Sequence, residues 1–439
     1  MTAPINVLTA VTDTGWETEL VATLDATQSG FRVIRRCVDL ADLLATAAAG
    51  VAQVALISGD LRRLDADVVS RLARSGVAAV GVVRSGDLAG ERRLLDLGVV
   101  AVVPAAGPKS ELAATIRRAV AAPPALSSSH GWSDPRAMTA DPRPAEPGMP
   151  EPALGRLVAV WGPTGAPGRT TVAVNLAAEA AGLGVSTVLV DADCYGGTVA
   201  PVLGLLDEAP GLAAAIRQAN SAGLDLPGLS GLAVTVGSRL CVLTGIARAQ
   251  RWPELRPTGL ERVLELCRRL AALTVVDCGF CLEDDEELAF DTAAPRRNGA
   301  TLTVLSRADT VVAVGAADPI GLQRLVRGLA DLRDLELARP VLTVVNQVRA
   351  AAVGGGDPRG QIRSALTRYA KVGEPRFVPA DRAACDRALA EGRLLAECAS
   401  ASPARLALRE LAGELTGRQV SSRRPRLPRW PRALAQRST

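Results

Sequence analysis

Short apolar runs alternate with amphipathic segments over the first 121 residues of the chain. The runs predict buried strands at Ile5–Val11, Phe31–Cys37, Gln53–Ser58, Val77–Val83 and Val99–Val103. The segments between and after them predict helices at Asp39–Ala49, Asp65–Ser75, Gly86–Leu97 and Lys109–Ala121. Strands that alternate with helices form a parallel sheet with helices on both faces. Residues 1–121 are therefore predicted to form a doubly wound α/β domain.

Residues 122–153 have a different composition. They contain eight prolines and the run Ser127-Ser128-Ser129. Such a segment cannot bury a core, so we predict a Pro/Ser-rich linker between two domains.

A second α/β domain is predicted over residues 154–417. Its strands are expected at Leu157–Trp161, Thr187–Val190, Leu240–Leu243, Leu273–Val276, Thr310–Val314, Val341–Val345 and Arg376–Val378. Their near-continuous apolar character is typical of a buried parallel sheet. The fold class is thus α/β throughout, with two doubly wound parallel-sheet domains followed by a basic tail over residues 418–439.

Composition narrows the class of protein. The chain has 439 residues, 48% hydrophobic and 22% charged, which is ordinary for globular domains and excludes collagen, coiled coil and whole-chain disorder. The longest uncharged apolar stretch, Leu43–Gly59, is broken by polar residues, so no integral membrane helix is expected. We find no secretory signal pattern and expect a cytoplasmic protein.

Histidine and cysteine usage excludes several chemistries. The single histidine, His130, lies in the Pro/Ser-rich segment, which excludes histidine metal clusters and Ser-His or Cys-His catalysis. The eight cysteines are unevenly spaced and are interpreted as reduced core residues.

Positive charge is concentrated at the end of the chain. The formal net charge is +4, but the residues from Gly417 onward carry seven arginines and no acid. Pro425, Pro428 and Pro431 recur every third residue, a spacing that suits a polyproline II helix with a basic edge. We expect this tail to contact an anionic membrane surface or an acidic protein groove, with a disordered solubilising tail as the alternative.

A Gly-rich loop follows the first strand of the second domain. Residues Gly162–Thr171 join this strand to a helix, and backbone N–H groups at such a helix start bind phosphate. The hydroxyl of Thr170 is placed to ligate Mg²⁺. Pro163 and Arg169 stand where the generic pattern has glycine and lysine.

Polar residues end three other strands of this domain. Asp191 and Asp193 follow one strand, Asp277 a second and Asn346 a third. Ligands of doubly wound sheets bind at the carboxyl ends of the strands. We therefore expect these side chains to lie beside the Gly-rich loop.

These blocks, in this order, resemble the MinD/ParA group of deviant Walker ATPases. The closest likeness is to its CpaE-like branch, which joins a degenerate receiver domain to the ATPase. The family's Lys-Gly-Gly-x-Gly-Lys-Thr loop falls on Thr164, Gly165, Ala166, Pro167, Gly168, Arg169 and Thr170. Three of these positions depart from the family, at Thr164, Ala166 and Arg169.

The resemblance implies roles for individual residues. It implies ATP or ADP bound by Gly165, Ala166, Gly168, Arg169, Thr170, Thr171 and Asn346, the last at the adenine. It implies Mg²⁺ bound by Thr170, Asp191 and Asp277, and catalysis by Asp193 and Arg169. The family's first lysine reaches a dimer partner's phosphates, which Thr164 cannot do. Arg169 is also not equivalent to lysine, so we expect nucleotide binding with weak or absent hydrolysis.

The N-terminal domain resembles a response-regulator receiver in architecture alone. A receiver has a phosphoacceptor Asp at the end of its third strand and a Lys at the end of its fifth. Ser58 and Ala105 stand near these positions. We interpret Asp60 as capping the following turn and expect it not to be phosphorylated.

Three functions remain open from the sequence. The first is a MinD/CpaE-like spatial regulator of septum-site selection or of pilus and secretion assembly, with homodimerisation and a protein partner implied by the resemblance. The second is a pseudo-ATPase scaffold without turnover. The third is a ParA-type DNA-partition ATPase, ranked last because charge is balanced outside the tail. Localisation is expected in the cytoplasm, with peripheral contact at the inner face of the membrane through the tail.

Overall fold

The chain divides into two compact units. The first comprises Met1–Glu151 with Gln218–Gly223, and the second comprises Pro152–Arg217 with Leu224–Thr439. The computed structural model describes residues 4–24, 30–62, 64–105, 107–121, 154–165, 167–205, 210–284, 296–337, 339–352 and 356–420. The predicted linker at 122–153, Ala166, and the tail from Ser421 onward lie outside the described residues.

The first unit is a parallel five-stranded sheet with strand order β2-β1-β3-β4-β5. This is one of the two common orders of doubly wound sheets. The strands are β1 Ile5–Ala10, β2 Phe31–Arg36, β3 Val54–Ser58, β4 Ala78–Val83 and β5 Ala101–Pro104. The helices are α1 Thr14–Leu24, α2 Leu40–Ala48, α3 Ala66–Arg74, α4 Leu88–Asp96 and α5 Lys109–Ala121.

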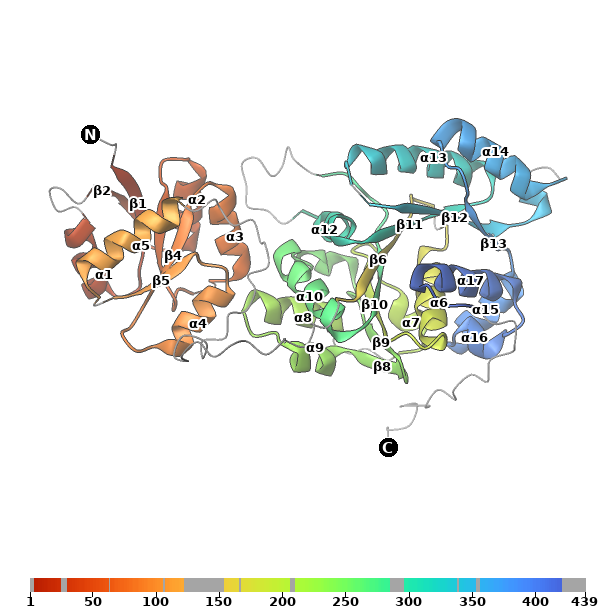
Figure 1. Ribbon diagram of the computed structural model, residues 1–439, viewed down its shortest axis with the longest axis horizontal. Coiled ribbons are helices and arrows are strands. Elements are labelled where there is room, and N and C mark those ends of the chain that lie inside the picture. Colours follow the sequence, from red (N-terminus) through yellow and green to blue (C-terminus); the bar gives the residue numbers. More distant parts are fainter. Residues whose placement is uncertain are drawn as a thin grey trace, which may run out of the picture. The chain divides into compact units, whose positions relative to one another are not determined.

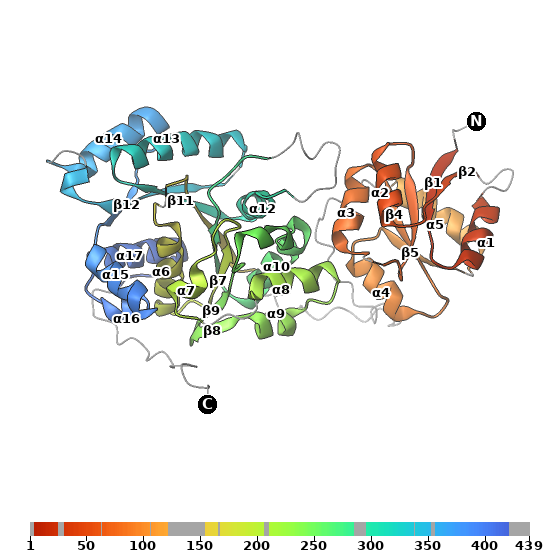
Figure 2. The ribbon, with the colours of Figure 1, turned by 180° about the vertical axis from the view of Figure 1, so that it is seen from behind.

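The sheet of the first unit separates two apolar layers. Leu43 of α2, Leu72 of α3 and Leu94 of α4 belong to the core on one face. Leu20 of α1 and Ile116 of α5 belong to the core on the other. Figures 1 and 2 show the two sets of helices on opposite sides of the strands.

The second unit contains an eight-stranded sheet of order β13-β12-β11-β6-β10-β7-β9-β8. Among the described strands, β8 and β9 form the antiparallel pair and the other pairs are parallel. The strands are β6 Arg156–Trp161, β7 Thr187–Ala192, β8 Val234–Gly237, β9 Leu240–Leu243, β10 Leu273–Cys278, β11 Thr310–Ala316, β12 Val341–Val348 and β13 Arg376–Pro379.

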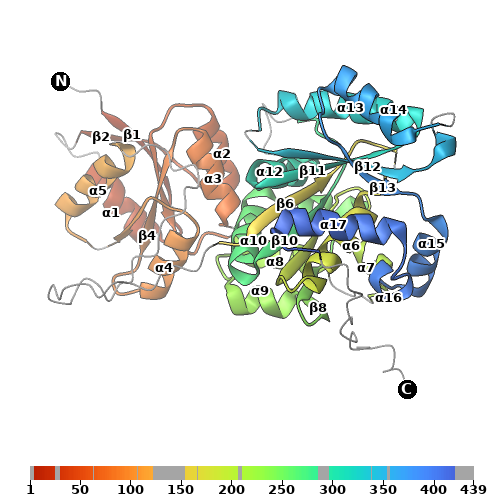
Figure 3. The same ribbon diagram turned by 45° about the vertical axis from the view of Figure 1, so that its right-hand side comes forward.

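Helices cover both faces of this sheet. The described helices are α6 Arg169–Gly182, α7 Val199–Val202, α8 Gly211–Asn220, α9 Leu226–Leu232, α10 Pro257–Leu270, α12 Gly299–Arg307, α13 Pro319–Asp334, α14 Pro358–Ala370, α15 Arg382–Glu391, α16 Leu395–Cys398 and α17 Pro403–Thr416. Figure 3 shows α13 and α14 on one side of β11 and β12, and α6 and α17 on the other. None of the described helices is long and apolar enough to cross a bilayer.

A buried ion cluster fixes α6 to the C-terminal helices. Glu179 on α6 accepts hydrogen bonds from Arg405 Nε at 2.6 Å and from Arg409 Nη1 at 3.2 Å. All three side chains are at most 8% exposed. One turn closer to the loop, Asn175 Oδ1 accepts the backbone N–H of Leu395 at 3.1 Å. The helix that starts at the Gly-rich loop is therefore held in place by contacts far away in the sequence.

Candidate functional site

The Gly-rich loop leads from the central strand β6 into α6. Gly165 has φ +100° and Gly168 has φ +90°, a region that favours glycine. A Cβ atom on Gly162 would lie 2.2 Å from the carbonyl oxygen of Val314 in β11. Gly168 is the N-cap of α6, and no side chain of the described residues caps this helix. The first-turn N–H groups of α6 are thus available to an anion, as the sequence predicts.

Thr170 and Asp277 are brought together at this helix start. The Thr170 hydroxyl donates to Asp277 Oδ2 at 2.6 Å. Asp277 is 1% exposed, and its other oxygen, Oδ1, has no hydrogen-bond partner within the described part of the chain. Burial raises the pKa of Asp277 well above its ordinary value, and the nearby Asp191 adds to the rise. A buried carboxylate oxygen without a partner is a place where a cation would be stabilised.

Asp191 is occupied by the backbone around it. Its two oxygens accept the N–H groups of Asp193 at 3.2 Å and Val199 at 3.1 Å. Burial raises the pKa of Asp191 to about 7, although these two hydrogen bonds oppose the rise. A Cβ atom on Gly245 would lie 2.6 Å from its carboxyl carbon. Asp191 therefore stabilises the turn after β7, and its role as a metal ligand stays a prediction.

Asp193 lies between the loop and the segment after β10. Its Oδ1 accepts the N–H of Tyr195 at 2.8 Å, and its Oδ2 lies 3.8 Å from Arg169 Nη2. The Tyr195 hydroxyl donates to Asn298 Oδ1 at 2.7 Å. The residue predicted to act on water is thus held in place through one oxygen and faces an arginine with the other.

The Arg169 guanidinium lies on the carbonyl groups of its own loop. Its Nη1 donates to Gly162 O at 3.2 Å and to Pro163 O at 3.1 Å. Its Nε is buried with no partner among the described residues, and its side chain is 13% exposed. Two of its donors are therefore used to close the loop.

Asn346, on β12, contacts the loop although β11 lies between β12 and β6 in the sheet. Its Nδ2 donates to Pro167 O at 2.9 Å. The pairing of β12 with β13 is irregular between Val345 and Val348, and Gln347 has φ +59°. Asn346 lies within this irregular stretch. Its location is as predicted, while its role at an adenine remains a prediction.

Two further residues complete the surroundings of the loop and were not predicted from the sequence. The ring of Phe280 lies 6.0 Å from the Arg169 guanidinium and 4.6 Å from the Tyr195 ring. Its carbonyl accepts the indole N–H of Trp161 at 3.1 Å. Arg324 of α13 lies against Gly165. Phe280 is three residues after Asp277, so its position in the chain could have indicated that it lies near the loop. The sequence around Arg324 contains no motif that would have indicated the same for this residue.

The oxygen ligands and backbone N–H groups at the loop suit a Mg²⁺ ion bound together with a phosphate chain. No group of three or more His, Cys, Asp or Glu side chains with metal-ligand geometry occurs within the described ranges. Mg²⁺ in nucleotide sites is commonly bound through one or two carboxylates, substrate phosphates and waters. One hydroxyl at Thr170, one open carboxylate oxygen at Asp277 and the uncapped start of α6 suit that mode of binding.

The carboxyl edge of the first unit has a different arrangement. Asp60 accepts hydrogen bonds from the hydroxyls of Thr12, at 2.5 Å, and Ser58, rather than capping the following turn as predicted. Although partial burial acts to raise it, these hydrogen bonds lower the pKa of Asp60 below its ordinary value.

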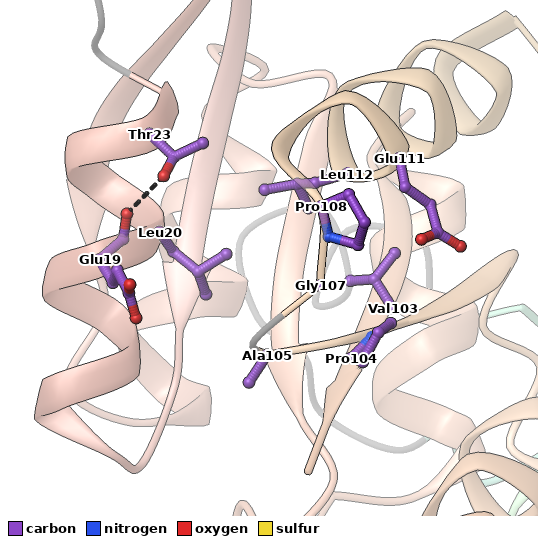
Figure 4. A pocket seen from close by; sticks show the side chains of 10 residues that line it. All are labelled: Glu19, Leu20, Thr23, Val103, Pro104, Ala105, Gly107, Pro108, Glu111 and Leu112. Carbon is purple, nitrogen blue, oxygen red and sulfur yellow. Dashed lines mark hydrogen bonds between the residues drawn. The ribbon is translucent and has the colours of Figure 1, made fainter. Parts of the chain in front are cut away.

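The first unit also has a pocket of about 120 Å³. It lies between α1 and the start of α5, and Figure 4 shows Glu19 and Glu111 at its sides. No residue proposed for chemistry lines this pocket.

Several solved structures are similar to this chain. The cell division ATPase MinD of Pyrococcus furiosus matches at 17% identity and TM-score 0.46, covering 60% of this chain and 99% of that one. The septum site-determining protein MinD of Pyrococcus horikoshii, complexed with Mg-ADP, matches at 17% identity and TM-score 0.46, covering 60% and 96%. A Cyanothece McdA variant in complex with ATP matches at 14% identity and TM-score 0.49, covering 62% and 100%. No family model and no curated protein matches the sequence.

Proposed function

We propose that this chain is a MinD/ParA-type nucleotide-binding protein that binds Mg²⁺ with ATP or ADP at the loop between β6 and α6. The observation that supports this best is the pair formed by Thr170 and Asp277, at a helix start that no described side chain caps and with Asp277 Oδ1 unpartnered among the described residues. Structural threonines and aspartates do not ordinarily leave a buried carboxylate oxygen without a partner.

Each residue of the site has a role in this proposal. The N–H groups of Arg169, Thr170 and Thr171 bind phosphate oxygens, and Thr170 with Asp277 holds Mg²⁺. Mg²⁺ held there would neutralise phosphate charge. Asp193 Oδ2 is the oxygen left to accept a proton from water, because Oδ1 already accepts the Tyr195 N–H. Asn346 would turn from Pro167 toward the base.

Slow or absent hydrolysis is part of the proposal. The Arg169 donors that would stabilise charge on a transferring phosphoryl group contact Gly162 O and Pro163 O. Thr164 carries no charge and Pro167 has no N–H. Loss of one charge-stabilising contact typically lowers the rate by about 10²–10³. A pseudo-ATPase scaffold, which binds nucleotide without turnover, is therefore the second candidate and is favoured by the contacts of Arg169.

The cellular role is proposed from the resemblance of the sequence blocks. It is that of a homodimeric spatial regulator of septum-site selection or of pilus and secretion assembly, with the first unit docking a protein partner. The basic tail would add peripheral contact with an anionic membrane. A ParA-type role on DNA is ranked last.

Calorimetric titration of the full chain with ATP, with and without Mg²⁺, tests the binding. We expect Mg²⁺-dependent binding that Thr170→Ala weakens by about 10-fold or more. Thr416→Ala is the matched control, because the Thr416 hydroxyl donates to Ala412 O within its own helix at 2.6 Å. Absence of heat at millimolar Mg-ATP in the unmodified chain would contradict the proposal. Phosphate release measured on the same sample separates the ATPase from the scaffold.

A further inference from the structure

Helix α13 is fixed directly against the Gly-rich loop. A Cβ atom on Gly328 would lie 2.9 Å from the Trp161 ring and 3.3 Å from Pro163 Cβ, so this glycine allows the helix to approach the loop closely. At the start of the helix, Asp318 Oδ1 accepts the N–H groups of Ile320 at 3.1 Å and Gly321 at 3.0 Å. Side chains one turn before Gly328 therefore project over the loop from a rigid element.

Arg324 occupies that position, four residues before Gly328. Its Nη1 lies 2.0 Å from where a Cβ atom of Gly165 would be, and its Cζ lies 3.1 Å from the same point. No side chain other than hydrogen fits at residue 165 while Arg324 is there. The guanidinium is thus in contact with the loop residue that follows Thr164.

The Arg324 guanidinium has capacity to bind an added anion. Within the part of the chain that the structure describes, it forms no hydrogen bond or ion pair, and the residue is exposed. Arg169 differs, because its Nη1 donates to two loop carbonyls and its Nη2 faces Asp193. Of these two arginines at the loop, Arg324 is the one whose donors no described residue uses.

We propose that Arg324 is a phosphate-binding residue of this site and supplies, from within the same chain, the positive charge that the loop lacks at Thr164. This inference rests on the proposed nucleotide binding and names a further residue for it. A guanidinium has five N–H donors and pairs well with phosphate oxygens. The rigid attachment of α13 positions this group beside the loop without the help of a second subunit.

The test compares Mg-ATP binding by four full-length proteins: the unmodified chain, Arg324→Ala, Arg324→Lys and Arg327→Ala. Arg327 is an exposed arginine of the same helix, so its variant makes the same change in net charge. We expect Arg324→Ala to raise the dissociation constant about 10- to 100-fold and to reduce its dependence on salt. Arg324→Lys should recover part of the affinity, and Arg327→Ala should bind as the unmodified chain does.

The outcomes separate this inference from the proposed function. Binding by the unmodified chain together with equal binding by Arg324→Ala and Arg327→Ala would overturn the role of Arg324 and leave nucleotide binding standing. Absence of binding by the unmodified chain would overturn both. Thermal unfolding of each variant without nucleotide confirms folding, and we expect unchanged midpoints because the residue is exposed.

Discussion

Asp60 in the first unit and Asp277 in the second both lie at the carboxyl edge of a parallel sheet, and their surroundings differ. Asp60 is exposed and accepts hydrogen bonds from two hydroxyls, which lower its pKa. Asp277 is buried, keeps one oxygen without a partner in the described chain, and has a raised pKa. The protein itself satisfies the first carboxylate, whereas the second keeps one oxygen that no described residue satisfies.

The ion pairs of Glu17 on α1 and Glu179 on α6 also differ in burial, with the more buried pair in the second unit. In the first unit, Glu17 accepts hydrogen bonds from Arg36, whose side chain is 49% exposed. In the second unit, Glu179 pairs with Arg405 and Arg409 where water is excluded. Buried ion pairs add little net stability but are costly to break, so they fix position more than they stabilise. In the second unit such a buried cluster fixes α6, the helix that begins at the Gly-rich loop. Rigid support of this kind is expected where side chains must be held in a defined geometry.

The largest expected effect tests this difference at α6. Glu179→Gln removes the charge that Arg405 and Arg409 share in a buried environment. Breaking a buried pair of this kind costs about 3–5 kcal/mol. We expect the free energy of unfolding of the second unit to fall by this amount. Urea unfolding of the full chain measures it, with hydrogen exchange in peptides from α6 and β10 as the readout for that unit.

Glu414→Gln is the matched control in the same unit. Glu414 pairs with Arg376 through two hydrogen bonds, but the two side chains are 40% and 38% exposed. An exposed pair contributes about 0–1 kcal/mol. Equal losses in the two variants would contradict the special role assigned to the buried cluster.

The second prediction concerns turnover. Restoring the family pattern with Thr164→Lys and Arg169→Lys should free the Gly162 and Pro163 carbonyls, add one positive charge at residue 164 and replace the Arg169 guanidinium by a compact ammonium. We expect phosphate release to rise by about 10²-fold, in line with the contribution of one such contact in other enzymes. Unchanged release in a double variant that still binds Mg-ATP would show that the loop sequence does not limit hydrolysis.

Much of this arrangement could be predicted from local sequence. Apolar runs bounded by glycines and acids predicted most strands to within one or two residues, because buried parallel strands have little else in them. Strand β12 extends three residues beyond its predicted end at Val345, and β8, Val234–Gly237, was not predicted. The rule that ligands gather at the carboxyl ends of strands correctly brought Asp193, Asp277 and Asn346 to the loop. The helix α1 was missed, because its buried face includes Glu17 and so breaks the apolar period.

Other features depend on contacts that local patterns do not encode. Glu179 and Arg405 are 226 residues apart, and each looks like an ordinary surface residue of an amphipathic helix. Arg324 is one of many arginines, and only the close packing of Gly328 on Trp161 brings it to Gly165. The contacts of Arg169 with its own loop also could not be predicted, since they depend on where the loop carbonyls point.

The third prediction uses the open oxygen of Asp277. Asp277→Asn keeps an acceptor for the Thr170 hydroxyl and replaces a carboxyl whose ionised form is disfavoured by burial, so the nucleotide-free second unit should gain up to about 1 kcal/mol. The same variant should lose the stabilisation that Mg-ATP gives the unmodified chain. Differential scanning calorimetry with and without Mg-ATP measures both effects.

Asp309→Asn is the control for this third prediction. Asp309 accepts the Leu157 N–H at 2.8 Å and a bond from Arg268 at 3.0 Å, so it is fully partnered. Its variant should lose stability rather than gain it. A loss in Asp277→Asn as large as in Asp309→Asn would mean that Asp277 is structural.

The smallest effect is expected at Asp60. Its hydrogen bonds to Ser58 and Thr12 lower its pKa in the folded state, so its stabilisation is present above the ordinary pKa and is lost as the pH falls through the lower, folded value. Because the residue is exposed, we expect Asp60→Asn to cost less than about 1 kcal/mol near neutral pH. The difference from the unmodified chain should shrink below about pH 4. The measurement is the protection of β3 peptides from hydrogen exchange in the full chain, which reports on the first unit alone. A difference that grows toward low pH would mean that the hydroxyls of Ser58 and Thr12 do not stabilise the ionised carboxylate, and the contrast with Asp277 would then fail.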